Sequence, residues 1–234
     1  MSFSDKTVLI TGAAGNLGRA VASAFAAAGA ALVLLDIDEH HLRAAYPGQD
    51  ARRLLLAADL GDGGAVEQAV ARAVVHYGRI DALCNLAGGF RMGPPVHETP
   101  ADTWNLLMDL NVGTLLNAVR AVVPKMLAAG GGRIVNVGAG SALSGKAQMG
   151  AYCASKSAVI RLTESMAAEL REHGVNVNCV LPSIIDTPQN RTDMPTADPR
   201  RWVAPRDLAH VILFLCSDDA RAIHGASIPV SGLS

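Results

Sequence analysis

Short apolar runs alternate with longer amphipathic stretches along the whole chain. The runs span four to seven residues and are rich in Val, Leu and Ile, which is typical of strands buried on both faces of a sheet. We predict strands over residues 7–10, 31–35, 53–57, 80–84, 133–137, 175–181 and 226–230. The amphipathic stretches predict helices over residues 19–28, 63–77, 102–127, 152–173 and 205–216.

This alternation of strand and helix predicts an α/β fold. Each strand is separated from the next by a stretch long enough to form a crossover, so we expect a doubly wound parallel β-sheet flanked by helices on both faces. At 234 residues, with no internal repeat or linker, residues 1–234 are predicted to form one domain. A polar segment with several prolines, ending near Pro199, is a candidate lid.

The first strand ends in a glycine-rich turn, Thr11-Gly12-Ala13-Ala14-Gly15-Asn16-Leu17-Gly18. Glycines let a backbone approach a diphosphate closely, and the N-terminus of the following helix offers free N–H groups. The order strand, glycine turn, helix therefore favours nucleotide binding over a plain capped turn. We take the cofactor-binding candidates here to be Gly12, Asn16, Leu17 and Gly18.

Asp36 stands at the end of the second strand, about 20 residues after the glycine turn. A carboxylate there can accept hydrogen bonds from both hydroxyls of a ribose and would repel a 2′-phosphate. No cation stands at Ile37 or inside the glycine turn to bind such a phosphate. This favours NAD over NADP, although Asp36 could instead only begin the turn before Asp38.

Tyr152 and Lys156 are four residues apart in a predicted helix, so they lie on one face. A nearby ammonium favours the phenolate and can lower a tyrosine pKa by about 1–3 units, which would make Tyr152 a general acid and base. The competing interpretation is an ordinary amphipathic helix. Asn111 lies among apolar residues in another helix, where it could belong to a structural network or to a proton relay.

Composition excludes several other functions. The net charge is −1 and the pI about 6.6, so the chain carries no electrostatic footprint for nucleic acid or an anionic membrane. We expect no apolar run to reach membrane-spanning length. The polar residues 1–6 at the start of the chain are unlike a signal peptide. Four scattered cysteines are typical of a reduced, cytoplasmic protein. The seven histidines lack metal-ligand spacing, and His40-His41 are predicted to be solvated.

Taken together, these segments resemble the short-chain dehydrogenase/reductase family over essentially the whole chain. The matching segments are T-G-A-A-G-N-L-G at 11–18, Asp36, Asp59-Leu60, N-L-A-G at 85–88, Asn111, Y-C-A-S-K at 152–156 and P-S-I-I-D-T-P at 182–188. The resemblance implies a Rossmann-type sheet of about seven strands, a nicotinamide dinucleotide cofactor and a small-molecule substrate. It also implies a homo-oligomer, a tetramer or dimer, paired through helices 102–127 and 152–173.

The resemblance also implies a role for each site residue. Tyr152 would be the acid and base, Lys156 would hold the nicotinamide ribose and lower the tyrosine pKa, and Asn111 would anchor a water in the proton path. Asp59, beside Leu60, would meet the adenine edge. Ile185 and Thr187 would fix the carboxamide of the nicotinamide, and the small residues Ala87 and Gly88 would leave room for the cofactor.

One position departs from the family pattern. Thirteen residues before Tyr152, where the family usually has a hydrogen-bonding serine, stands Ala139. Losing one donor to a developing oxyanion typically costs about 10²–10³ in rate. Three explanations compete: Ser141 supplies the hydroxyl, the substrate needs none, or the protein is a weak or inactive catalyst.

A second resemblance bears on this choice. The segments 87–90, 137–145 and 181–198 are similar to quinonoid dihydropteridine reductases, which also lack the serine. A quinonoid ring takes up hydride into a conjugated system, so no isolated alkoxide has to be stabilised. The sequence therefore leaves three hypotheses: an NAD(H)-dependent oxidoreductase acting on a small carbonyl, alcohol or conjugated substrate, a quinonoid dihydropteridine reductase specifically, or an NAD(H)-binding sensor without chemistry.

Overall fold

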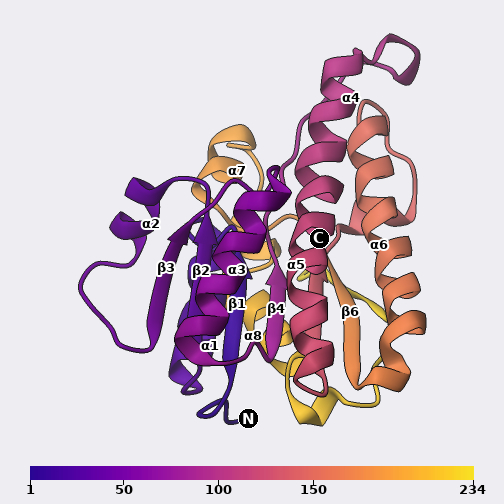
Figure 1. The fold of residues 1–234 in the computed structure, drawn as a ribbon. Helices are drawn as coiled ribbons and strands as arrows, with labels where there is room; N and C mark the ends of the chain where they lie inside the picture. The colour runs from indigo at the N-terminus through magenta and orange to yellow at the C-terminus, as the bar shows by residue number, and fades with distance from the viewer.

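The computed structural model describes residues 1–234 as strands and helices in alternation (Figure 1). The strands are β1 (Thr7–Thr11), β2 (Ala31–Asp36), β3 (Arg53–Ala57), β4 (Ala82–Asn85), β5 (Gly132–Val137), β6 (Val175–Pro182) and β7 (Ser227–Val230). The helices are α1 (Asn16–Ala27), α2 (Glu39–Ala45), α3 (Gly63–Tyr77), α4 (Ala101–Met108), α5 (Thr114–Ala128), α6 (Gly150–Leu170), α7 (Pro188–Asp193) and α8 (Pro205–Leu215).

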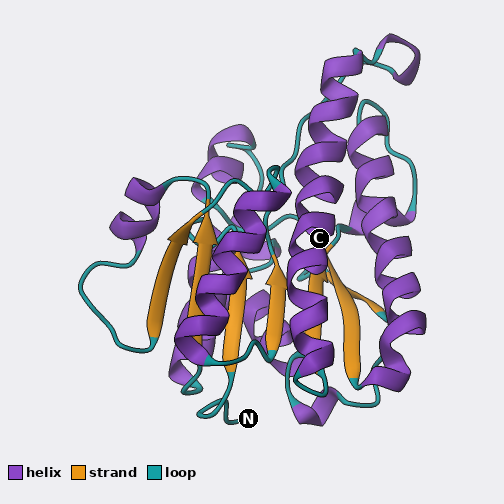
Figure 2. Cartoon of the chain, in the orientation of Figure 1, coloured by secondary structure: helices purple, strands orange, loops and turns teal.

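All seven strands form one parallel sheet in the order β3-β2-β1-β4-β5-β6-β7 (Figure 2). The chain begins in the middle of the sheet at β1, runs outward to β3, and returns to the other side of β1 as β4. The connections therefore diverge above the carboxyl ends of β1 and β4. This is the position at which open parallel sheets bind ligands. The predicted seven-stranded Rossmann-type fold is confirmed.

The sheet buries apolar side chains on both faces. Along β1, Leu9 packs in a core with α3, α5 and α6, whereas Val8 and Ile10 pack in a second core with α1 and α8. The split follows the two-residue period of a strand, which sends successive side chains to opposite faces. It explains why the strands are almost continuously apolar in sequence.

The helix predicted over residues 102–127 is continuous but not regular. Between α4 and α5, residues Asp109–Gly113 form a π-helical turn that carries the buried Asn111. A π-helical turn inserts one extra residue and often occurs at a functional site. Because of this inserted residue, the side chain of Asn111 points in a different direction from the one that regular α-helical spacing would predict.

The expectation that no apolar run reaches membrane-spanning length is wrong for this same helix. Residues Ala101–Ala128 form 28 continuous helical residues whose most apolar window has a mean hydropathy of 1.4, and half of that window is buried within the protein. Its buried face includes Leu115, Val122 and Met126, which belong to the core beneath the sheet. A core helix that covers a parallel sheet passes the same test of length and composition as a membrane span.

Two short helices have bounds that the pattern did not predict, although Asp38-Glu39 was interpreted as a possible helix entry. Asp38 caps the N-terminus of α2 by accepting a hydrogen bond from the His41 N–H at 3.0 Å. Thr187 caps α7 by accepting one from the Asn190 N–H at 3.1 Å, and Pro188 occupies the first turn. Both caps place a short polar helix above the carboxyl edge of the sheet. The segment interpreted as a lid is thus partly helical.

Candidate active site

A cleft of about 550 Å³ lies above the carboxyl ends of β1 and β4. Its volume is within the range of about 300–1,000 Å³ that is common for ligand sites. Ten of the predicted cofactor-binding residues line it together: Gly12, Asn16, Leu17, Gly18, Asp36, Asp59, Leu60, Ala87, Gly88 and Thr187. Residues from five separate segments of the chain therefore converge where the sequence predicted a dinucleotide.

The glycine turn forms one wall of this cleft. A Cβ added to Gly18 would lie 2.7 Å from the backbone of Ala13 and would also collide with the Gly12 carbonyl. Gly12 itself has a φ of +63°, which L side chains rarely adopt. The backbone can therefore fold tightly only with glycine at both positions, and it leaves the N-terminus of α1 facing the cleft, where the helix dipole favours an anion.

The carboxylate of Asp36 is held rigidly against this turn. It accepts a hydrogen bond from the Ala14 N–H at 2.8 Å and another from the Ile37 N–H at 2.9 Å. The first bond joins the end of β2 to the glycine turn. The carboxylate is thus fixed in the lining of the cleft, and its role toward a ribose stays a prediction.

Two further residues reach the cleft. Asp59 accepts a hydrogen bond from the Gly61 N–H at 2.8 Å, which shapes the turn after β3, and its neighbour Leu60 also faces the cleft. His41, expected to be a solvated helix position, is exposed but also lines the cleft. Sequence reasoning assigned His41 to solvent because no local pattern shows that the first turn of α2 lies beside the cleft.

Lys156 and Asn111 come together directly behind Gly88, which lines the cleft. A Cβ on Gly88 would lie 2.7 Å from Asn111 Oδ1 and 3.1 Å from Lys156 Nζ. Only a residue without a side chain leaves room for both groups. Lys156 is buried on α6, and its Nζ donates a hydrogen bond to the Val137 carbonyl at 2.9 Å.

Asn111 is part of a network that ties three elements together. Its Oδ1 accepts from the Gly89 N–H at 2.9 Å and its Nδ2 donates to the Gly89 carbonyl at 3.1 Å. The same Nδ2 donates to Ser155 Oγ at 3.1 Å, and Ser155 Oγ donates to the Tyr152 carbonyl at 2.8 Å. Of the two roles that spacing left open, the structure shows the network. The proton relay stays a prediction.

A second buried chain of polar side chains fixes α6 to the sheet. Asn136 on β5 accepts a hydrogen bond from Asn85 Nδ2 at 2.9 Å, and its own Nδ2 donates to Thr163 Oγ1 at 2.8 Å. Thr163 lies on α6, two helical turns after Lys156. Buried amides without partners are costly, so this chain selects one register of α6 against the sheet.

Burial shifts the pKa values of Tyr152 and Lys156 in opposite directions. Removal of the phenol from water raises the pKa of Tyr152 to about 12. Desolvation of the ammonium lowers the pKa of Lys156 to about 8. The expectation that Lys156 lowers the tyrosine pKa is therefore wrong for this structure, in which the ammonium is bonded to the Val137 carbonyl instead.

Thr11 was missed as a site residue although it begins the glycine motif. Its Oγ1 accepts hydrogen bonds from the N–H groups of Leu86 at 3.0 Å and Ala87 at 3.2 Å, which pins the turn after β4 to the end of β1. Leu110 and Thr114 were missed too, and both line the cleft from either side of Asn111. Their spacing around a buried polar residue was the available signal.

The predicted residues Ser141 and Ile185 lie outside the lining of the cleft, as do Tyr152, Lys156 and Asn111, of which Lys156 and Asn111 lie directly behind Gly88. Ser141 belongs to a short 3₁₀ turn, Gly140–Leu143, that packs on α6, and it is half-buried. Ala139, at the start of that turn, is buried. Ile185 is half-buried, and its carbonyl accepts from Asn190 Nδ2 at 2.8 Å, so it holds α7 in place. Their predicted roles toward a ligand stay predictions.

Comparison with known proteins agrees with this geometry. A sequence profile described as short chain dehydrogenase matches residues 6–198. The chain belongs to the short-chain dehydrogenase/reductase family. It is 34% identical to a D-threitol dehydrogenase of Mycolicibacterium smegmatis over 97% of this chain and 92% of that protein. It is 32% identical to an NAD-dependent glycerol dehydrogenase of Listeria innocua over 99% of this chain and 94% of that one.

A solved structure extends the likeness to three dimensions. The crystal structure of an NAD⁺-bound xylitol dehydrogenase superposes with a TM-score of 0.90 at 28% identity, covering 99% of this chain and 100% of that one. The relatives are named dehydrogenases. As a member of the same family over nearly its full length, this chain is an oxidoreductase.

Proposed function

We propose that this short-chain dehydrogenase/reductase transfers hydride between NAD(H) and a small alcohol, carbonyl or conjugated substrate. The observation that carries the proposal is a cleft that Asp36 and Gly88 both line, with Lys156 directly behind Gly88 and one helical turn from Tyr152. Measurement of NADH oxidation against a panel of ketones, quinones and quinonoid dihydropterin tests it. A protein that binds NADH and turns over no member of the panel would favour the sensor hypothesis.

The residues of the cleft fit a nicotinamide dinucleotide. The close backbone at Gly18 and the N-terminus of α1 suit a diphosphate, and the fixed carboxylate of Asp36 suits a ribose. Thr187 and Ile185 would hold the carboxamide end, and Asp59 with Leu60 the adenine end. When bound, the nicotinamide supplies a two-electron carrier that takes up or gives one hydride.

The chain's own contribution is the proton. Tyr152 Oη would give a proton to the substrate oxygen in reduction and take it back in oxidation. With its pKa raised to about 12, Tyr152 is protonated at neutral pH and ready to act as an acid. Oxidation needs the phenolate, so Lys156 would have to turn its ammonium from the Val137 carbonyl toward the ribose and the phenol. The hydrogen bonds of Asn111 to Gly89 and to Ser155 would hold the turn after β4 and the start of α6 in place during this change.

The proposed preference for NAD rests on Asp36 and has a direct test. Asp36→Ala should reduce the preference for NADH over NADPH, measured as the ratio of their affinities, by about 10–100-fold. The substitution removes a charge-assisted acceptor for the ribose hydroxyls of NADH and the repulsion of the 2′-phosphate of NADPH. Kd values from fluorescence titration with both nucleotides measure it. Asp38→Ala, which removes a carboxylate at the cap of α2, is the matched control. An Asp36→Ala protein that remains as selective as wild type would contradict the assignment.

The role of Ser141 is tested in the same way. If its hydroxyl replaces the donor missing at Ala139, Ser141→Ala should lower kcat by about 10²–10³-fold, the magnitude for one oxyanion donor. If the substrate needs no such donor, kcat stays within about twofold. Ser144→Ala, in the same loop and exposed, is the control. Because Ser141 is half-buried in the 3₁₀ turn that packs on α6, we expect the second result.

A quinonoid dihydropteridine reductase is the second candidate function. The buried Ala139 favours it, since a conjugated acceptor spreads the incoming charge over a ring.

We also propose that residues 1–234 act as one domain and that the protein assembles as a tetramer or dimer. Cross-linking and light scattering measure the assembly.

A further inference from the structure

The ring of Phe90 lies directly against the ring of Tyr152. Their centroids are 4.9 Å apart and the planes are at 90°, an edge-to-face contact that aromatic pairs prefer. Tyr152 is half-buried, but Phe90 remains 56% exposed. One side of the Phe90 ring therefore packs against Tyr152, the proposed acid and base, and the other side is exposed to solvent.

The loop that carries Phe90 is held along the start of α6. The Gly93 N–H donates to the Gln148 carbonyl at 2.8 Å, and the space a Cβ would need at Gly150 is filled by Val96. Gln148 has a φ of +60°, a left-handed conformation that is uncommon outside glycine. Three contacts, from Phe90, Gly93 and Val96, therefore fix this loop against residues 148–152.

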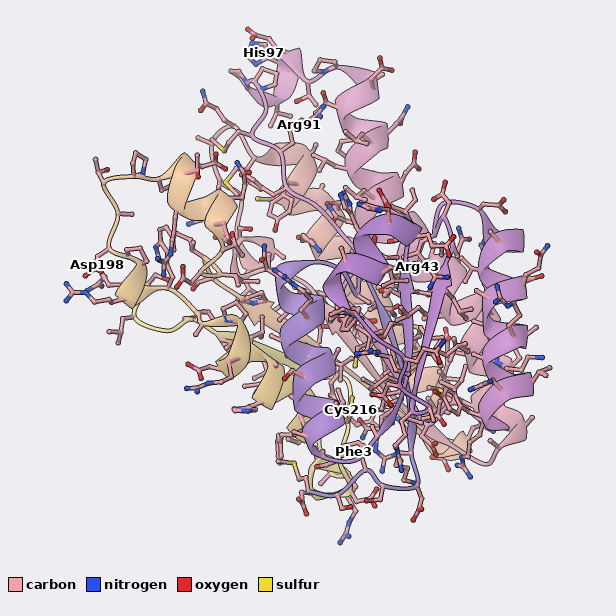
Figure 3. All side chains as sticks on the ribbon, turned by 90° about the vertical axis from the view of Figure 1, so that its left-hand side faces the viewer. Phe3, Arg43, Arg91, His97, Asp198 and Cys216 are labelled. Atoms are coloured by element: carbon pink, nitrogen blue, oxygen red, sulfur yellow. The ribbon has the colours of Figure 1, made fainter.

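Exposed apolar side chains continue from Phe90 on both sides of the start of α6. Met92 and Val96 are on the same loop, and Leu143 is on the 3₁₀ turn that packs against α6. The loop lies at the end of the molecule opposite Phe3 and Cys216, as the positions of Arg91 and His97 show (Figure 3). Phe90 thus offers an exposed apolar ring directly beside Tyr152, which suits a polyol poorly and a ring well.

We propose that Phe90 is a specificity-determining residue that packs against a planar aromatic or conjugated ring of the substrate. The ring would bring its carbonyl or its reducible atom beside Tyr152 Oη. This inference rests on the proposed function and narrows it, because it separates the chain from the polyol dehydrogenases among its relatives. It also accounts for Ala139, since a conjugated ring disperses charge that an isolated carbonyl oxygen would concentrate.

The test compares two ketones of similar shape, acetophenone and cyclohexyl methyl ketone, binding to the NADH-saturated full-length protein by calorimetry. Wild type should bind the aromatic ketone about 3–10-fold more tightly, the range expected for one additional aromatic contact. Phe90→Leu, which keeps an apolar side chain and removes the ring, should bring the ratio close to one. Val75→Leu, at an exposed apolar position on α3 away from the cleft, should leave it unchanged.

Any of three results would overturn the inference. The first is equal affinity for the two ketones in wild type, and the second is a Phe90→Leu protein with the wild-type ratio. The third is tighter binding of D-threitol than of either ketone. Failure of the proposed function is distinct: the protein would then not bind NADH, or Tyr152→Phe would leave turnover unchanged, whereas a failure of the Phe90 inference leaves NADH binding and Tyr152-dependent turnover of aliphatic substrates intact.

Discussion

Tyr152→Phe is expected to lower kcat by about 10²–10⁴-fold, the contribution typical of one general acid or base. The substitution removes only Oη, and the remaining ring can keep its edge-to-face contact with Phe90 at 4.9 Å. NADH affinity should stay within about threefold of wild type, because the cradle at Gly18 and Asp36 is untouched. Steady-state kinetics and a fluorescence titration of NADH measure the two quantities.

Tyr77→Phe is the matched control for this experiment. Tyr77 ends α3, and its hydroxyl lies 3.5 Å from the Ala51 carbonyl, away from the cleft. Its loss should leave kcat unchanged. If Tyr152→Phe retains wild-type turnover, Oη is not the group that moves the proton, and the assignment of acid and base is withdrawn.

Lys156→Met should weaken NADH binding by about 10–150-fold, the value of one hydrogen bond that involves a charged group. Methionine keeps the volume and the apolar stem of the lysine and removes the ammonium beside Gly88. Thermal stability at neutral pH should not fall by more than a few degrees, since the lost bond to the Val137 carbonyl is offset by removal of a buried charge. Loss of binding without loss of stability is the signature of a ligand-holding lysine.

The pH dependence of this pair follows from the lowered pKa of Lys156. The pKa of Lys156 is about 8 in the folded protein, against an ordinary lysine pKa of 10.5. Between these values the unfolded chain binds the proton and the folded protein does not, so this group makes the free energy of unfolding rise with pH across that window. The contribution is present in full above pH 10.5 and is lost as pH falls through 8. It should be absent from Lys156→Met.

The affinity for NADH should fall as pH rises, opposite to the trend in the free energy of unfolding. As pH rises through about 8, the ammonium of Lys156 is lost and NADH affinity should fall toward the value for Lys156→Met. Lys125→Met, at the exposed end of α5, serves as the control and should reproduce the wild-type profile. A pH profile that is identical in wild type and Lys156→Met would show that another group titrates.

The order of elements and much of the cleft could be predicted because their signals are local. The pattern of neighbouring residues is enough to predict a short strand such as Arg53–Ala57, whose centre is apolar. It is also enough to predict the strand, glycine turn and helix at residues 7–28. The parallel topology then brings Asp36, Asp59 and Ala87 to one edge without further information, since each stands at or just after the end of a strand.

The short polar helices and the π-helical turn could not be predicted from periodicity. α2 and α7 are each about two turns long and depend on the caps Asp38 and Thr187. The π-helical turn at Asn111 depends on Gly89, 22 residues earlier, whose backbone the asparagine binds on both its N–H and its carbonyl. Such contacts join segments that no local pattern relates.

The sequence by itself determined the kinds of group at this site: a glycine cradle, a carboxylate after the second strand, and a tyrosine and a lysine one helical turn apart. Only the tertiary structure decided what state they are in. It buries Lys156 and bonds its ammonium to the Val137 carbonyl, raises the pKa of Tyr152, and lays Phe90 against the phenol from 62 residues away. The reason is that proton affinity and ring packing depend on which distant groups exclude water, and spacing along the chain does not encode that.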